Sequence, residues 1–223
     1  MQISLLYGLN ALAAALFLMT AFLFLASRQT AGSLSLFVRQ ALLLSASALL
    51  QAYALHSLDL LLVAVITVAA KVFLIPWMLR RSLGGTFQSR REVELAVSVP
   101  TSLVIAIGAS LVAYFVSQPI ASQMPSFVAV NLPVGLAGLL ISVYALAVRR
   151  EALPQFLSLL MLDNAAFFAG VAIASTSALW EIIAALEGII VTIIVALLTR
   201  TISERIGTTQ VGQLAGLREE GSR

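Results

Sequence analysis

Long uninterrupted apolar segments restrict most strongly what this 223-residue chain can fold into. A helix needs about 20 mostly apolar residues to cross a hydrocarbon core of ~30 Å. Only 10% of the residues are charged, whereas a soluble domain carries about 25%. The sequence therefore predicts an all-α integral membrane protein, and it excludes a soluble globule, a disordered chain and a nucleic-acid binder. Seven segments are long enough, at residues 3–27, 37–56, 58–79, 95–117, 126–148, 154–174 and 178–200.

Positive charge in alternate connections predicts the orientation of these seven spans. The connections at 56–59, 118–124 and 175–178 contain no Lys or Arg, whereas every other connection and the C-terminal tail are basic. Cytoplasmic loops are enriched in these residues, so we expect the N-terminus outside and the C-terminus in the cytoplasm of a cell inner (plasma) membrane. Residues 1–10 contain no basic residue, which favours a retained first span over a cleaved signal peptide. The arginines of the basic connections are Arg28, Arg39, Arg80, Arg81, Arg90, Arg91, Arg149 and Arg150, and we interpret them as topology determinants.

One segment with loop chemistry divides the chain. Residues 84–91 read Gly-Gly-Thr-Phe-Gln-Ser-Arg-Arg, which is typical of a linker. We predict an N-terminal three-span unit at 1–83, a linker with the fourth span at 84–124, and a three-span module with a cytoplasmic tail at 125–223. Pro76 lies five residues after Lys71, and we expect it to distort the third span there.

The chain contains few groups that could carry chemistry. It has no cysteine and one histidine, which excludes disulfides, thiolate-held clusters, zinc–thiolate sites and multi-histidine metal sites, so no cofactor is expected in it. Nearly all charged residues lie in connections or at span ends. Three exceptions are Lys71, Asp163 and Glu187, each roughly 13–20 Å from the predicted cytoplasmic boundary.

Charges at mid-membrane depth suggest an ion path. Each costs at least ~2.5–3.5 kcal/mol to insert, and such groups usually face the bundle interior. Burial disfavours the charged forms, while an opposite charge restores them, so a lysine–carboxylate pair can change charge by moving one proton. We therefore predict a proton path through Lys71, Asp163 and Glu187. The plainer alternative is an ion pair that only joins helices.

Two further residues are secondary candidates for that path. His56 lies at the outer end of the second span, where a solvated loop position is the simpler interpretation. Glu181 follows Trp180 at the outer end of the seventh span, where an interfacial position is the simpler one.

The second half of the chain resembles a known family. A basic pair, Arg149-Arg150, precedes an apolar helix with Leu-Met-Leu-Asp163-Asn164, and a second helix carries Ala-Ala-Leu-Glu187-Gly188 before a Thr-Arg exit at 199–200. Residues 126–218 resemble the three-span K-type subunit of respiratory complex I and the C-type subunit of Mrp antiporters. With four spans ahead of this module, the chain is similar to component E, a membrane subunit of hydrogenase-4 and formate hydrogenlyase complexes (group 4).

The resemblance implies a function for the whole chain. Asp163 and Glu187 take the positions of the two family carboxylates, through which protons are thought to pass to antiporter-like subunits. The chain would be a non-redox membrane-arm subunit, not itself catalytic, beside antiporter-like and K-, J- and H-type neighbours and a peripheral nickel–iron and iron–sulfur arm. Two other interpretations stay open: a stand-alone seven-span ion or solute transporter, and a purely structural assembly subunit.

Overall fold

The described part of the chain is helical. The computed structural model describes residues 2–88, 96–172 and 193, and no β-strand occurs among them. The elements are α1 (Gln2–Ala26), α2 (Thr30–Leu55), α3 (Leu58–Thr67), the π-helix η1 (Val68–Leu74), α4 (Ile75–Gln88), α5 (Val99–Ala121), α6 (Ser126–Ala129), α7 (Asn131–Val148) and α8 (Ala152–Ala172).

Six segments among these residues are long and apolar enough to cross a membrane. They are Ser4–Ala26, Thr30–Leu55, Leu58–Arg81, Val99–Ala121, Asn131–Val148 and Ala152–Ala172. The all-α prediction is thus confirmed for the described residues, and these six helices, which are long and apolar enough to cross a membrane, correspond to the first six predicted spans. The second helix starts seven residues before the predicted position, at Thr30 rather than 37. The seventh predicted span, with Glu181 and Glu187, lies outside the described residues.

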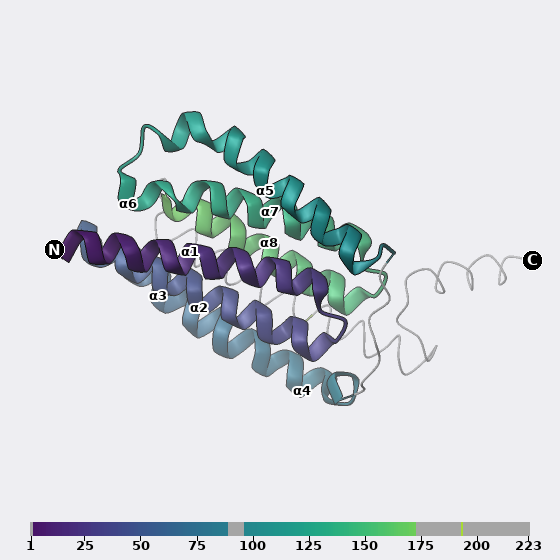
Figure 1. Ribbon diagram of the computed structural model, residues 1–223. Helices are drawn as coiled ribbons and strands as arrows, with labels where there is room; N and C mark the ends of the chain where they lie inside the picture. The colour runs from purple at the N-terminus through teal and green to yellow at the C-terminus, as the bar shows by residue number, and fades with distance from the viewer. Residues whose placement is uncertain (1, 89–95, 173–192, 194–223) are drawn as a thin grey trace, which may run out of the picture.

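The helices form an antiparallel bundle (Figure 1). The start of α1, the α2–α3 turn and α6 lie at one end, which we call the N-terminal end. The α1–α2 and α7–α8 connections and the end of α4 lie at the other. Because Arg28, Arg149 and Arg150 belong to those two connections, we call this the arginine-rich end.

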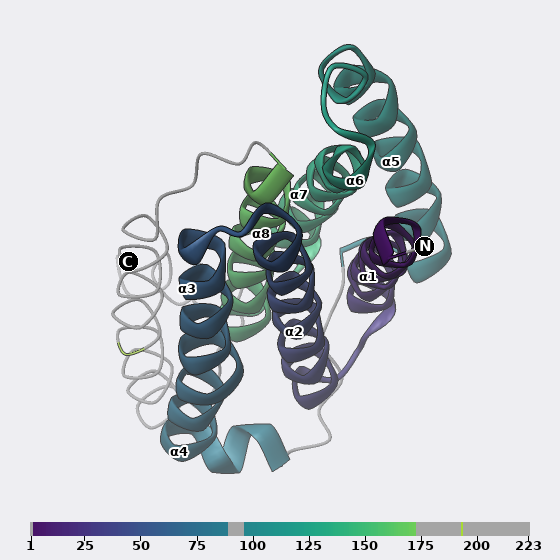
Figure 2. The same ribbon diagram turned by 90° about the vertical axis from the view of Figure 1, so that its left-hand side faces the viewer.

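Four helices from both halves of the chain form the centre. α7 packs closely on α8, while α1 and α2 contact each other and pack on α7 and α8 respectively. Figure 2 shows α5 on one flank of this centre and α3 on the other. Large apolar side chains of α5, such as Val104 and Phe115, are 68% and 70% exposed, so this helix presents hydrocarbon outward. In a bilayer that surface faces lipid or another apolar helix.

Close packing of α7 on α8 depends on two glycines. A methyl group placed on Gly135 would lie 2.6 Å from Cβ and 2.7 Å from Cα of Ala169. One placed on Gly138 would lie 3.1 Å from Cβ of Ala165. Small residues let membrane helices approach closely, and packing rather than hydrophobic transfer drives their association there. This contact therefore fixes the position of α8, the helix that carries Asp163.

The predicted distortion of the third span takes the form of η1. Pro76 lacks the N–H that an α-helix would use there, and the preceding Ile75 N–H donates to the carbonyl of Ala70, five residues back. The buried stripe shifts by one residue across this turn. Thr67 and Lys71 are followed by buried Ile75 and Leu79, one position later than an uninterrupted heptad pattern would give.

Candidate functional site

Lys71 and Asp163, two predicted site residues, form an ion pair. The Lys71 Nζ of η1 lies 2.8 Å from Asp163 Oδ2 of α8, although 92 positions separate the two residues in sequence. Lys71 is 2% exposed and Asp163 35%. The structure therefore brings together two of the three charges predicted at mid-membrane depth, and Glu187 lies outside the described residues.

An aromatic ring completes the surroundings of the ammonium group. Lys71 Nζ lies 4.5 Å from the ring centroid of Phe167, one turn after Asp163 on α8. A cation over a ring face gains about 0.5–2 kcal/mol, the larger value when water is excluded. The ammonium thus has a carboxylate on one side and an aromatic face on another, both from α8.

Chemically, this pair can exchange a proton but offers little else. Asp163 is partly open to its surroundings while Lys71 is enclosed, so the carboxylate is the member that a proton can reach from outside the pair. Among residues 2–88 and 96–172 no three His, Asp or Glu side chains lie together in a manner that would hold a metal ion.

The secondary candidate His56 has a conformational role in the α2–α3 turn. It is the C-cap of α2, with a φ of 51° in the left-handed region, and its N–H donates to the carbonyl of Ala52. A residue with a Cβ loses about 1–2 kcal/mol in that conformation. Ser57 then caps α3 by accepting from the N–H of Leu60 at 3.4 Å. The structure places exposed His56 at the N-terminal end, away from the ion pair.

A ring of uncharged polar side chains, absent from the sequence prediction, joins three helices near the N-terminal end. The Asn10 Nδ2 of α1 donates to Asn131 Oδ1 of α7 at 2.9 Å, Asn131 Nδ2 donates to Ser47 Oγ of α2 at 2.7 Å, and Ser47 Oγ donates to Asn10 Oδ1 at 2.7 Å. Gln51 Nε2 also donates to Ser47 Oγ at 3.3 Å. All four side chains are fully buried. Closed rings of this kind specify one arrangement of the helices.

A second polar contact lies beside the ion pair. Asn164, the residue after Asp163, donates from Nδ2 to Gln40 Oε1 of α2 at 3.3 Å, and both side chains are fully buried. A search for charged residues inside the spans passes over Gln40 and Asn164 because they carry no charge. The signal that could have found them is spacing: Gln40, Ser47 and Gln51 share one face of α2.

Arg149 is buried, which corrects its interpretation as a loop charge that only sets topology. Its side chain lies under the α1–α2 connection and is 1% exposed. Its Nη2 donates to the carbonyl of Phe24 at 2.6 Å, its Nη1 to Ser33 Oγ at 3.4 Å, and its guanidinium lies 4.1 Å from the Phe24 ring centroid. Burial lowers the pKa of Arg149 to about 10, an effect that nearby Glu151 opposes. Arg149 therefore fastens α7 to α1 and α2.

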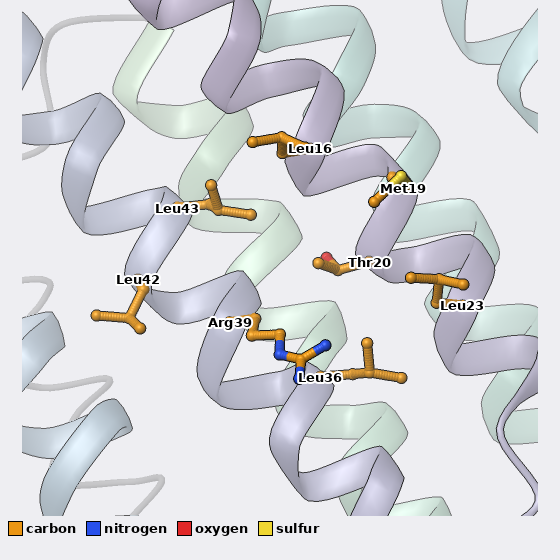
Figure 3. A pocket seen from close by; sticks show the side chains of 8 residues that line it. All are labelled: Leu16, Met19, Thr20, Leu23, Leu36, Arg39, Leu42 and Leu43. Atoms are coloured by element: carbon orange, nitrogen blue, oxygen red, sulfur yellow. The ribbon is translucent and has the colours of Figure 1, made fainter.

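The hollows between α1 and α2 are lined almost entirely by apolar side chains. One hollow has a volume of about 300 Å³. Figure 3 shows its lining side chains, which are apolar apart from Thr20 and Arg39. The Thr20 hydroxyl donates to the carbonyl of Phe17 at 2.6 Å. The lining residues are Leu16, Met19, Thr20, Leu23, Leu36, Arg39, Leu42 and Leu43. Such a surface suits hydrocarbon, so the ion pair remains the candidate functional site.

Comparisons with known proteins give one relative and no activity. The chain is 28% identical over 161 residues to the uncharacterized protein Rv0085 of Mycobacterium tuberculosis, and the aligned part covers 72% of this chain and 73% of that protein. No protein-family model matches the chain. No solved structure matches it either.

Proposed function

We propose that this chain is a non-redox membrane-arm subunit of a group 4 hydrogenase or complex I-like assembly. In this role it contributes Lys71, Asp163 and Glu187 to a proton or sodium path that is coupled to electron transfer in partner subunits. The chain would cross a cell inner membrane seven times, with its N-terminus outside and its C-terminus in the cytoplasm. Antiparallel packing with Arg28, Arg149 and Arg150 at one end supports this orientation.

The buried Lys71–Asp163 pair carries the proposal. Two opposite charges 2.8 Å apart inside apolar helices are an expensive means of joining α8 to η1, because apolar residues of similar volume often do this equally well. The pair becomes useful when one proton moves to the carboxylate, since the site then holds a neutral acid beside the ammonium group and its charge has changed. Lysine and carboxylate groups inside membranes commonly mark proton relays for this reason.

Neutral replacement separates a relay from an ion pair that only joins helices. Asp163→Asn removes the carboxylate beside the enclosed Lys71 and should destabilise the chain by up to about 3–5 kcal/mol, whereas Lys71→Met should cost less because Asp163 is 35% exposed. Replacing both at once removes this penalty, and the double variant should assemble with its partners. Asp59→Asn, which changes an exposed carboxylate in the first turn of α3, is the matched control.

The measurement is proton translocation by the intact complex in sealed membrane vesicles, with assembly followed on native gels. We expect the double variant to assemble normally and to lose coupled translocation, and Glu187→Gln to lose it as well. A double variant that assembles and translocates at the wild-type rate would show that the pair only joins helices. A purified chain that moves a solute without partners would instead establish an independent transporter.

A further inference from the structure

One face of α2 alternates polar and apolar residues along the membrane. Its buried positions repeat with spacings of four and three residues, as in a heptad, and each is fully buried. We call them the α2 seam: Ser33, Phe37, Gln40, Leu44, Ser47 and Gln51. The polar levels contact three other helices: Ser33 contacts Arg149 at the end of α7, Gln40 contacts Asn164 of α8, and Ser47 contacts Asn10 of α1 and Asn131 of α7.

Three side-chain atoms along this seam have no hydrogen-bond partner within the described part of the chain. They are the donor Gln40 Nε2 and the acceptors Asn164 Oδ1 and Gln51 Oε1. Each belongs to a fully buried side chain, and an unsatisfied buried polar group costs about 1–3 kcal/mol. Native proteins satisfy the large majority of buried side-chain polar atoms, often with internal water. Gln40 Nε2 can donate to a water molecule and Asn164 Oδ1 can accept from it, so one water could bridge the two amides.

Of the two levels with unsatisfied atoms, the Gln40–Asn164 level is the nearer to the ion pair and the Gln51 level is the farther from it. Asn164 adjoins Asp163 in sequence, so the Gln40–Asn164 contact lies at the depth of the pair. Gln51 and the ring around Ser47 lie about 10–16 Å further toward the N-terminal end along α2. One apolar level separates them. It contains Leu44 and the stacked rings of Phe17 and Phe168, whose centroids are 4.1 Å apart.

We propose that the α2 seam binds internal water at the Gln51 and Gln40–Asn164 levels and forms the access route from the N-terminal side to Asp163. The apolar level of Phe17, Leu44 and Phe168 closes the route in this conformation. This inference rests on the proposed role of Lys71 and Asp163 in proton exchange, because it states how a proton would reach that pair. Leu44 is the seam residue that separates the water at the Gln40–Asn164 level from the water at the Gln51 level, because it lies between Gln40 and Ser47 on α2.

Cysteine accessibility tests the route, and the chain has no native cysteine to interfere. Single variants of the full chain, Ser47→Cys and Gln40→Cys, are placed in sealed vesicles and exposed to a small charged methanethiosulfonate on the side of the N-terminus. Only a thiolate reacts, and a thiol ionises only where water reaches it. Leu42→Cys is the control, because Leu42 is 45% exposed on the outer face of the same helix, where it meets hydrocarbon.

We expect Ser47→Cys to be modified at least about tenfold faster than Leu42→Cys, the change in thiolate fraction that one unit of thiol pKa produces. Gln40→Cys should react slowly beside native Leu44 and at least about tenfold faster when Leu44→Ala opens the apolar level. Asn164→Cys provides a second reporter at that depth if Gln40→Cys does not fold. Mass spectrometry gives the modified fraction over time.

Three results would overturn the inference. If Ser47→Cys reacts no faster than Leu42→Cys, water does not enter the seam and the polar levels only fix helix register. If Gln40→Cys and Asn164→Cys stay unreactive with Leu44→Ala, the water ends at the Ser47 ring. If they react equally with Leu44 or Ala at that position, Leu44 does not close the route. None of these labelling rates depends on coupled proton movement, so this inference and the relay proposal can fail separately.

Discussion

Gly135→Ala should separate α8 from α7 and destabilise the bundle. The added methyl group would meet Cα and Cβ of Ala169 at 2.7 and 2.6 Å, where ordinary contacts lie at 3.4–4 Å. The obstacle includes backbone, which cannot rotate away as a long side chain can. Restoring normal contact requires the helices to part by roughly 1 Å, and a gap of that size removes a quarter to a half of the dispersion energy of each neighbouring contact.

The net effect can be worked out from two opposing terms. Overpacking costs about 1–3 kcal/mol, and we expect the upper end because backbone atoms obstruct the methyl group. Replacing a helical glycine by alanine gains about 1 kcal/mol. The free energy of unfolding should therefore fall by about 2 kcal/mol, which lowers the unfolding temperature by about 4–8 °C for a chain of this size.

The assay is thermal unfolding of the purified full chain in one detergent, with Gly108→Ala as the matched control. Gly108 lies within a helix, α5, and no atom lies within 4 Å of a methyl group placed there, so only the gain of about 1 kcal/mol applies. The two variants should thus shift the unfolding temperature in opposite directions. If Gly135→Ala is as stable as Gly108→Ala, the close approach of α7 to α8 described above is wrong.

Three further changes test features outside that contact. Asn131→Leu should lower the free energy of unfolding by about 2 kcal/mol, because it removes the two hydrogen bonds that Asn131 makes to Asn10 and Ser47. Asn10→Leu combined with it should cost clearly less than the sum of the two, and additive losses in this double-mutant cycle would refute the ring. His56→Gly should raise the unfolding temperature by relieving about 1–2 kcal/mol of left-handed strain without altering proton translocation, whereas reduced translocation would place His56 on the path. Arg149→Gln should destabilise by about 2 kcal/mol through loss of the Phe24 contacts. Since burial lowers the pKa of Arg149 to about 10, the unfolded chain holds this proton more tightly than the folded chain. The stability of the wild type relative to Arg149→Gln should therefore increase as the pH rises above about 10, and denaturant titrations at several pH values would reveal an opposite or absent trend.

Sequence could predict the charged part of the candidate site because charge inside a membrane is rare. Lys71 and Asp163 stand out from apolar neighbours, and counting residues to the nearest arginines predicts a similar depth for both. Their pairing also needs the rotation of η1 and the packing of α8, which depend on contacts between distant segments. Pro76 is visible in the sequence as a sign of distortion. The type of distortion depends on which carbonyl accepts the N–H of the preceding residue, Ile75, and in the structure it is the carbonyl of Ala70.

The uncharged polar core was beyond the sequence analysis for a physical reason. Asn10, Gln40 and Asn131 change the hydropathy of a 20-residue window only slightly, so each resembles a tolerated exception. Arg149 has the opposite problem: as one of two adjacent arginines after a span, it resembles a solvated topology signal. Whether it turns inward depends on the position of the Phe24 carbonyl, 125 residues away.

The π-helix makes the length of the third span a functional constraint. One residue removed between Val68 and Leu74 would allow an ordinary α-helix to form, with normal hydrogen bonding and nearly unchanged hydropathy. Every residue beyond the deletion would turn by about 100° relative to those before it. Either Lys71 would leave α8, or Ile75 and Leu79 would leave the core. Relatives that keep this ion pair should therefore vary in the identity of the residues in this turn but not in their number.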